Sequence, residues 1–378
     1  MRVGLVIDWH PSSTGGVQSH VRYLALWLAK RGLEVSIISR RIGFRDVDTL
    51  PSVPSFTVDS VIPLESLIIP PNVSSIKETL LRGKFDLIHS HHIFTLLPLM
   101  SLKYAHDLGV SRVITNHTLF FFYDSSIWST LSYLTPARYY LRYAQAVISV
   151  SQEARKFVEN LVGRDARFRH VVIPNGVDTE KYSPPEREPE ENRIVFVGRL
   201  VHRKGVHVLI NAAPLIMREI KDLEIVIVGE GYMKTVANVL SRILKVSDRV
   251  KLVGWLSESE KIRILRSAKI VVVPSLYNEC FGITAIEAMA TGRPVIATSV
   301  GGLKEVVEER KTGLLVPPGS ARELAEAVVT LLQDEALRRE MGRRAREVAE
   351  ERYSWSIVSE QIVRVYEEVL SESRGGRA

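Results

Sequence analysis

Short apolar runs alternate with amphipathic helical patterns along most of this 378-residue chain, and this alternation is the strongest constraint on its fold. The runs are continuous, as in strands that are buried on both faces of a sheet. A helix between successive strands makes those strands parallel and covers both faces of the sheet. In the first half, strands are expected within residues 3–7, 33–39, 85–92, 111–118 and 145–151, and residues 170–178 close this half.

The same alternation starts again after residues 182–192, which are charged, interrupted by proline and without apolar periodicity. A chain of this length is long for a single core. We therefore expect an N-terminal domain at 1–180, a linker at 181–192 and a second domain at 193–352, followed by an amphipathic helix at 355–371. Strands of the second domain are expected within residues 193–198, 223–229, 249–254, 269–274, 294–298 and 312–317.

Both domains are expected to be doubly wound α/β sheets whose strand carboxyl ends face each other across one cleft. Ligands of such sheets bind at the carboxyl ends of the strands, so the residues directly after each strand are the candidates for a site. Residues 321–351 form a long helical pattern, which we expect to break near Gly342.

Composition narrows the class of protein. The single cysteine, Cys280, excludes an internal disulfide and a cysteine-rich metal site. No apolar run reaches the roughly 18–20 residues that span a bilayer, and the N-terminus lacks a signal-peptide layout. The net charge of +7 suits an acidic ligand or an anionic membrane surface. We expect a cytoplasmic protein, peripheral on the inner face of the membrane if it binds one, with no nucleic-acid partner.

Residues 274–302 combine a strand end, a polar loop and a helix start. Phe281, Gly282 and Ile283 mark the start of this helix, where free N–H groups and the helix dipole favour an anion. Glu279 lies just before the helix and Glu287 about two turns later, so both carboxylates can face one ligand. Such a segment suits a sugar joined to a phosphate, although solvated glutamates would give the same pattern.

Basic residues follow the first strand of the second half. Arg199 and Lys204 are five residues apart where a strand opens into a helix, and together they could neutralise a pyrophosphate. A solvated basic surface is the alternative. The strand ends at 229–231 and 253–255 could line a nucleotide base, although glycine is common at such positions.

Two strand ends in the first half offer further ligand-binding groups. Gly15 and Gly16 precede a helix and would let the backbone approach a phosphate, but the full dinucleotide pattern G-x-G-x-x-G is absent. Asn116 and His117 follow another strand, and the histidine could reach a substrate hydroxyl or a developing charge. A structural turn and a structural histidine are the alternatives.

The segment His89-Ser90-His91-His92 suggests a metal site at first sight. No carboxylate follows closely, however, and a strand would direct His89 and His91 to one face and His92 to the other. We therefore predict no metal site there, and expect substrate contacts or structural histidines instead.

Residues 120–143 hold nine of the 28 aromatic residues of the chain, interleaved with Arg138 and Arg142. An aromatic, cationic and amphipathic segment could lie in a membrane interface or hold a lipid acceptor. Helices that pack these aromatic side chains inward are the alternative.

The motifs together resemble a known family. The Glu279-x7-Glu287 block, the stretch V-G-R-L-V-H-R-K-G, V-I-P-N-G-V-D and the Gly-Gly loop look like the retaining GT-B glycosyltransferases of family four, over nearly the whole chain. Within that family, H-S-H-H-I-F and T-N-H-T-L-F-F-F are similar to enzymes that add N-acetylglucosamine to phosphatidylinositol, and more distantly to phosphatidylinositol mannosyltransferases.

The resemblance implies two Rossmann-like domains, with the C-terminal helix crossing back to the first. It implies that the second domain holds most of a UDP- or GDP-sugar, and that no metal or other cofactor is required. By position, it implies that Arg199 and Lys204 bind the donor diphosphate, that Glu287 binds the ribose and that Glu279 binds the sugar hydroxyls. It also implies that His117 contacts the transferred sugar. Further donor contacts are implied for Gly15, Gly16, Asn116, Phe281, Gly282 and Ile283.

The function expected from the sequence is therefore a hexosyltransferase that moves a hexose or N-acetylhexosamine to an acceptor such as an inositol-type lipid. A nucleotide-sugar epimerase or hydrolase on the same fold is an alternative, and so is a non-catalytic nucleotide-sugar-binding module. The absent dinucleotide pattern argues against an oxidoreductase.

Overall fold

The computed structural model divides the chain into two compact units. Unit 1 comprises Met1–Gly176 and Trp355–Ala378, and unit 2 comprises Val177–Ser354. The structure describes residues 1–13, 15–40, 53–62, 69–119, 135–163 and 167–375. None of the helices in these ranges is both long and apolar enough to cross a membrane.

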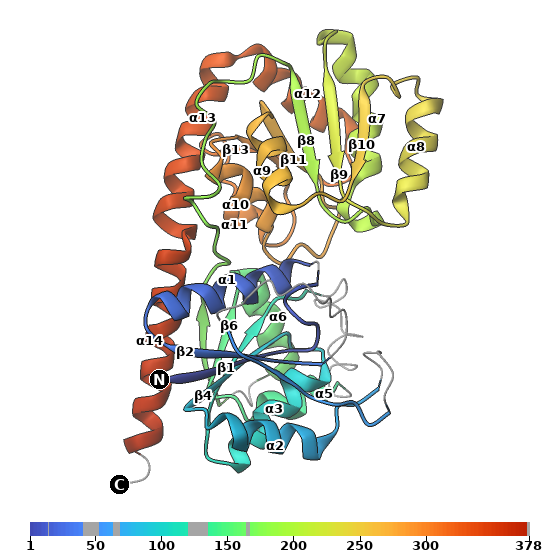
Figure 1. Ribbon diagram of the computed structural model, residues 1–378. Coiled ribbons are helices and arrows are strands. Elements are labelled where there is room, and N and C mark those ends of the chain that lie inside the picture. The colour runs from blue at the N-terminus through green and yellow to red at the C-terminus, as the bar shows by residue number, and fades with distance from the viewer. Residues whose placement is uncertain (14, 41–52, 63–68, 120–134, 164–166, 376–378) are drawn as a thin grey trace. The chain divides into compact units, whose positions relative to one another are not determined.

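Unit 1 is built on a sheet in which every strand pair is parallel (Figure 1). The strand order is β3-β2-β1-β4-β5-β6-β7, so the chain winds outward from β1 in both directions. The strands are β1 (Arg2–Ile7), β2 (Glu34–Ser39), β3 (Ser55–Thr57), β4 (Leu87–His91), β5 (Ser111–Asn116), β6 (Ala146–Ser149) and β7 (Arg169–Val172).

Helices cover both faces of this sheet. Helices α1 (Gly16–Lys30) and α14 (Trp355–Gly375) pack with β1 and β2 in one apolar cluster, which includes the buried ring of Trp355. The other face carries α2 (Val73–Gly83) and α3 (Leu96–Asp107). The described part of unit 1 also contains α5 (Pro136–Leu141) and α6 (Gln152–Val162). The last helix of the chain therefore completes the core of unit 1.

Unit 2 repeats the arrangement with strand order β10-β9-β8-β11-β12-β13, again with every pair parallel. This confirms the predicted doubly wound α/β fold of two parallel sheets. The strands are β8 (Arg193–Val197), β9 (Glu224–Val228), β10 (Val250–Gly254), β11 (Ile270–Val273), β12 (Val295–Thr298) and β13 (Gly313–Val316). The helices are η2 (His202–Lys204), α7 (Val206–Glu219), α8 (Met233–Ile243), α9 (Glu258–Arg266), α10 (Ile283–Ala290), α11 (Leu303–Val306), α12 (Ala321–Gln333), α13 (Glu335–Val348) and η3 (Ala349–Tyr353).

Two details of unit 2 differ from the sequence-based expectation. The segment 181–192 belongs to unit 2, where the ring of Tyr182 is buried. The helical run also breaks at Asp334, whose carboxylate caps α13 by accepting a hydrogen bond from Leu337 N. The prediction of a break near Gly342 was wrong. Gly342 lies inside α13, and a Cβ there would come within 2.4 Å of Gly292 O, so this glycine serves close packing.

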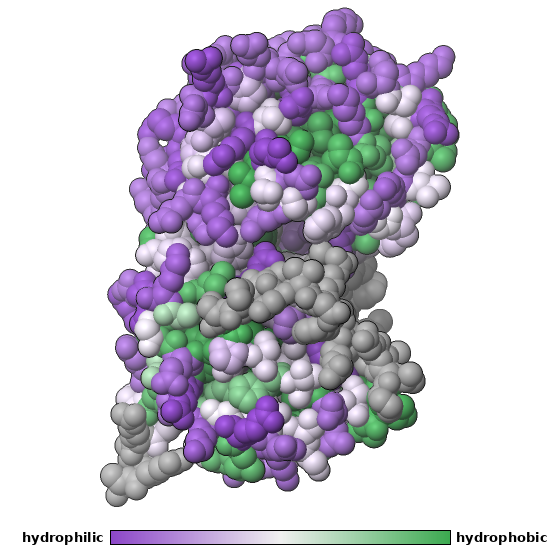
Figure 2. Space-filling model, viewed as in Figure 1, coloured by the Kyte–Doolittle hydropathy of each residue, from purple (hydrophilic) through white to green (hydrophobic). Residues whose placement is uncertain are grey.

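Unit 2 also exposes apolar side chains around α8 and β10, where Figure 2 shows an apolar area of the surface. Val236, Val239 and Ile243 lie along one side of α8, and Val253 and Trp255 come from β10 and the residue after it. This face is unlike the rest of the helix, because Met233 and Ala237 point into the core.

Gly205→Ala should destabilise unit 2 by more than about 3 kcal/mol, because a Cβ at φ +71° would lie 1.9 Å from Pro274 O. Gly319→Ala is the matched control. Its φ is +79°, but a Cβ there would make only ordinary contact, so the loss should be about 1–2 kcal/mol. Urea unfolding of both variants checks this, and equal losses would contradict the steric argument.

Candidate functional site

A partly buried ion pair joins the loops that follow two neighbouring strands of unit 2. Lys204 ends η2, in the segment after β8, and its Nζ lies 2.6 Å from Oε2 of Glu279, in the loop after β11. Ser275 Oγ donates to the same carboxylate oxygen at 2.7 Å. Backbone contacts support the pair, since Leu276 N donates to Arg203 O at 2.7 Å. The two loops are therefore held together at the carboxyl edge of the sheet.

The environment of Glu279 keeps it ionised. Burial is the largest influence and raises the pKa of this carboxyl, but the attraction of Lys204 and the hydrogen bonds from Lys204 and Ser275 together lower it below its usual value. Both bonds fall on Oε2, and no described residue donates to Oε1. Glu279 can therefore still accept a hydrogen bond from a ligand through Oε1.

Arg199 remains as an unpaired cation beside this ion pair. Its side chain is exposed, and within the described part of the chain it forms no salt bridge within 4.0 Å. Partial burial and repulsion by Arg203 lower its pKa, while Glu279 is near enough to raise it. An arginine remains protonated under these influences. Arg199 is therefore a positive charge beside the ion pair that no carboxylate of the described residues neutralises.

Glu287 is the second buried carboxylate, on α10. Its Oε1 accepts hydrogen bonds from Lys261 Nζ of α9 at 2.6 Å and from the Tyr182 hydroxyl at 3.3 Å. Lys261 also lies over the Tyr182 ring, 5.3 Å from its centroid. Glu279 and Glu287 are thus each paired with a lysine from a neighbouring element.

The N-terminus of α10 lies directly after Glu279. Gly282 is its N-cap, with φ +101° and no side-chain capping bond. Alanine there would be strained and would bring Cβ within 2.5 Å of Leu303 Cδ2. The ring of Phe281 is buried against Tyr353, so only its backbone can reach a ligand. The first turn of α10, including Ile283, therefore presents backbone N–H groups for an anion.

In unit 1, Gly15 and Gly16 are exposed at the start of α1, again without a side-chain cap. The amide of Asn116 is engaged internally, because Nδ2 donates to Ala154 O at 3.2 Å and Oδ1 accepts from Thr118 N at 2.9 Å. The carbonyl of Gly15 accepts a hydrogen bond from Ser19 N, so what the two glycines offer a ligand, as far as the described residues show, is their backbone N–H groups.

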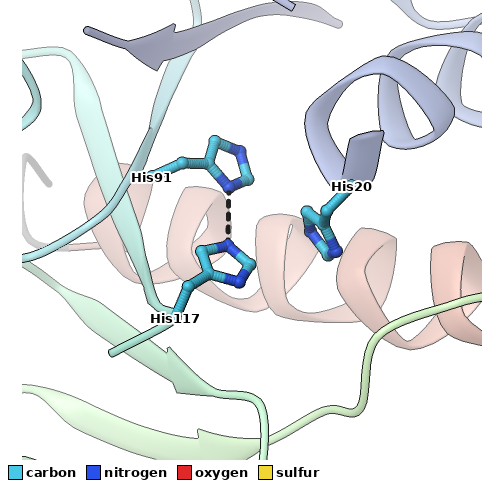
Figure 3. Close-up of side chains that lie close together, drawn as sticks. All are labelled: His20, His91 and His117. Carbon is cyan, nitrogen blue, oxygen red and sulfur yellow. Dashed lines mark hydrogen bonds between the residues drawn. The ribbon is translucent and has the colours of Figure 1, made fainter. Parts of the chain in front are cut away.

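His117 lies in a group of histidines from three elements (Figure 3). Its Nε2 is 3.4 Å from Nδ1 of His91, at the end of β4, and His20 of α1 faces it with ring centroids 4.6 Å apart. Burial lowers the pKa of His117 and His91 well below the usual range and that of His20 to about 3, so the rings are neutral at pH 7. His92 is separate, with φ +86° and a hydrogen bond to Thr118 Oγ1.

Several partners in these sites were not found from the sequence. They are Ser275, Lys261, Tyr182 and His20. Lys261 and His20 each lie among other polar residues on a helix, and Tyr182 lies in the segment that was interpreted as a linker. No local sequence signal distinguishes them, because each is defined by a neighbour that is distant in the chain.

Comparison with known families agrees with this architecture. The family "Glycosyl transferases group 1" matches residues 178–348, and "Glycosyltransferase Family 4" matches residues 14–181. The chain is 31% identical to a phosphatidyl-myo-inositol mannosyltransferase of Mycobacterium leprae, over 98% of each chain. It is 29% identical to a human subunit of phosphatidylinositol N-acetylglucosaminyltransferase, over 98% of this chain and 76% of that protein.

Solved structures give the same fold. Sucrose-phosphate synthase from Thermosynechococcus elongatus superposes with a TM-score of 0.81 at 25% identity, covering 98% of this chain and 99% of that one. Anabaena Alr3699/HepE, solved with UDP, superposes with a TM-score of 0.81 at 21% identity, covering 97% and 99%. The fold is that of the GT-B glycosyltransferases. The chain belongs to glycosyltransferase family 4, and it is a glycosyltransferase.

Lys204→Met should cost more stability at pH 7 than at pH 4. In the wild type, the Glu279 pKa is lowered, so the ion pair stabilises the fold above the usual glutamate pKa and is lost as pH falls through the lowered value. Without Lys204, burial raises that pKa, and the unpaired carboxylate destabilises the fold by about 3 kcal/mol at pH 7. Protonation at pH 4 relieves this cost.

Urea unfolding of the wild type and Lys204→Met at both pH values measures the difference. Lys204→Arg is the matched control, because it keeps a positive charge beside Glu279. A loss of stability that is the same at pH 7 and pH 4 would show that Glu279 does not depend on Lys204 for its charge.

Proposed function

We propose that the protein is a retaining glycosyltransferase that moves a hexose or N-acetylhexosamine from a nucleotide-sugar to an acceptor. The observation that carries this proposal is the grouping at the carboxyl edge of unit 2. Neighbouring parallel strands are followed by Arg199, which has no salt-bridge partner in the described ranges, by the Lys204–Glu279 pair and by the open N-terminus of α10. Cations and N–H groups at one edge suit a diphosphate, and a carboxylate beside them suits sugar hydroxyls.

The donor assignment also draws on related structures. The Anabaena protein has been solved with UDP and with UDP-glucose. In our chain, the exposed Arg199 is available to the diphosphate. Lys204 Nζ has three protons, one of which bonds Glu279, so it can still donate to a phosphate oxygen. Glu279 would bind a sugar hydroxyl through Oε1, and Glu287 the ribose.

The chemistry follows from where charge develops. Departure of the nucleoside diphosphate builds negative charge on phosphate oxygens and oxocarbenium character on the sugar. Arg199, Lys204 and the α10 N-terminus would stabilise the first, so no metal ion or other cofactor is required. For retention, the acceptor would attack from the leaving-group face, with the departing phosphate taking its proton. Glu279 is committed to Lys204 and Ser275, which fits a binding role better than that of a nucleophile.

The acceptor is proposed to be a lipid of the inositol type and to bind unit 1. Relatives that match nearly the whole of this chain are named for phosphatidylinositol glycosylation. We assign His117 to contact the transferred sugar, and the backbone of Gly15 and Gly16 to contact the phosphate of the donor. Residues 120–134 of the proposed lipid-binding segment lie outside the described residues. In the described part, Ala137 and Leu141 are buried, while Tyr139 and Arg142 are exposed, with Arg142 stacked on the Tyr139 ring at 4.0 Å.

A donor panel tests the function directly. UDP-glucose, UDP-N-acetylglucosamine and GDP-mannose are titrated by calorimetry, and nucleotide release is then followed with phosphatidylinositol as acceptor. We expect one donor to bind and to turn over only with acceptor, and NMR of the product to show the anomeric configuration of the donor. Turnover without acceptor would instead identify a hydrolase or epimerase, and binding without any turnover a non-catalytic module.

Arg199→Ala and Lys204→Ala should each lower kcat by at least about 10²-fold, because each removes a charge that stabilises the leaving diphosphate. Arg322→Ala is the control, since Arg322 is exposed on α12 and pairs with Glu326 on the same helix. Initial rates of nucleotide release at saturating donor measure the effect. Wild-type rates in both site variants would rule out the diphosphate assignment.

Vesicle binding should depend on anionic lipid and on Arg138 and Arg142 if the segment 120–143 contacts membrane. Co-sedimentation with vesicles that contain or lack phosphatidylinositol measures this for the wild type and for the double alanine variant. Arg322→Ala again serves as the control for general loss of charge. Binding that is indifferent to both lipid charge and the two arginines would assign the segment to the core.

A further inference from the structure

Three histidines from separate elements of unit 1 place ring nitrogens within 4.8 Å of one another. Figure 3 shows His20 projecting from α1 towards His117, which follows β5, while His91 projects from the end of β4. Among the described residues, no carboxylate or thiol belongs to this group, which we call the histidine cluster. Its chemistry is therefore that of three imidazoles.

The histidine cluster contains polar atoms that find no partner among the described residues. Within that part of the chain, neither nitrogen of the buried His20 ring makes a hydrogen bond, and the same is true of His91 Nε2. A buried polar atom without a partner costs roughly 1–3 kcal/mol, so three such atoms at one place are a substantial cost. This arrangement suggests that the histidine cluster binds a ligand that several ring nitrogens contact at once.

The ligand chemistry of the histidine cluster favours a cation, because a neutral imidazole nitrogen offers a lone pair to a metal ion. Imidazole nitrogen suits Zn²⁺, Ni²⁺, Cu²⁺ and Fe²⁺, whereas Mg²⁺ and Ca²⁺ need oxygen ligands that this group lacks.

The spacing is close to what such an ion requires. Ligands about 2.0–2.1 Å from a tetrahedral zinc lie about 3.3 Å from one another. His91 Nδ1 and His117 Nε2 are already 3.4 Å apart. Side-chain rotation of His20 would complete the set, and the half-buried His117 leaves a side from which water could supply a fourth ligand.

A supporting residue is also present for His20. A metal-binding histidine usually donates its other ring N–H to an oxygen. The buried Oδ1 of Asn175 accepts no hydrogen bond from any residue that the structure describes, and the Asn175 side chain lies close enough to raise the pKa of His20 against the larger effect of burial. Asn175 can therefore orient His20 while the opposite nitrogen binds an ion.

We propose that His20, His91 and His117 form a Zn²⁺-binding site in unit 1, separate from the diphosphate-binding residues of unit 2. The ion is not needed for the chemistry proposed above. If His117 also serves the transferred sugar, which rests on the proposed function, ion and donor compete for this ring. Zinc then regulates transfer by occupying the histidine cluster.

Calorimetric titration of the full chain with ZnCl₂ tests the site, after removal of any polyhistidine tag and treatment with EDTA. Wild type should bind one equivalent. His20→Gln and His91→Gln should each weaken binding by at least about 100-fold, since each loses a ligand. His106→Gln is the control, because His106 is an exposed histidine of unit 1 on α3. No binding by wild type, or wild-type affinity in both variants, would overturn the proposal and leave water as the occupant.

A measurement on the wild type alone guards against variants that fail to fold. Co²⁺ should give the intense visible bands of a four-coordinate ion, and added Zn²⁺ should displace it. Only the weak bands of six-coordinate Co²⁺ would overturn the site. These titrations contain no nucleotide-sugar, so their failure is distinct from failure of the proposed transfer reaction.

Discussion

The candidate site in unit 2 depends on one buried charge, the carboxylate of Glu279. Burial alone would drive this group towards its neutral form, and the Lys204 ammonium 2.6 Å away reverses that tendency. Removing either partner would leave the other charge poorly solvated. The pair therefore requires that the loops after β8 and β11 stay together, and this fixes Arg199 and the start of α10 near the same edge.

The sequence predicts this part well, for a physical reason. Continuous apolar runs identify the buried strands, and parallel pairing brings all their carboxyl ends to one edge of the sheet. Lys204 and Glu279 are 75 residues apart, yet each lies in the segment that follows a strand, and β8 pairs with β11. Position after a strand was thus sufficient to select the two loops, although it did not show that the two residues bond each other.

Contacts that do not follow from strand ends were missed. Lys261 reaches Glu287 from the side of α9, and Tyr182 does so from a segment whose prolines suggested a linker. The helix break at Asp334 was not predicted, because helix capping depends on local geometry. Gly342 was predicted to break the helix because glycine is a poor helix former, but in the structure it allows close packing. The histidine cluster was also not predicted. Only His91 lies in the histidine-rich segment, and the fold brings His20 and His117 close to it from distant parts of the sequence.

The two buried glutamates also suggest how the site is prepared for a ligand. Lys204 and Lys261 have long side chains, and restricting such a chain costs about 1.5–2 kcal/mol of conformational entropy. Folding has already restricted both, because each is bonded to a carboxylate. Arg199 lacks such a partner among the described residues, so a ligand must restrict it on binding. For the donor proposed above, rigid lysines would define where it lies, while Arg199 would contribute a positive charge that attracts it.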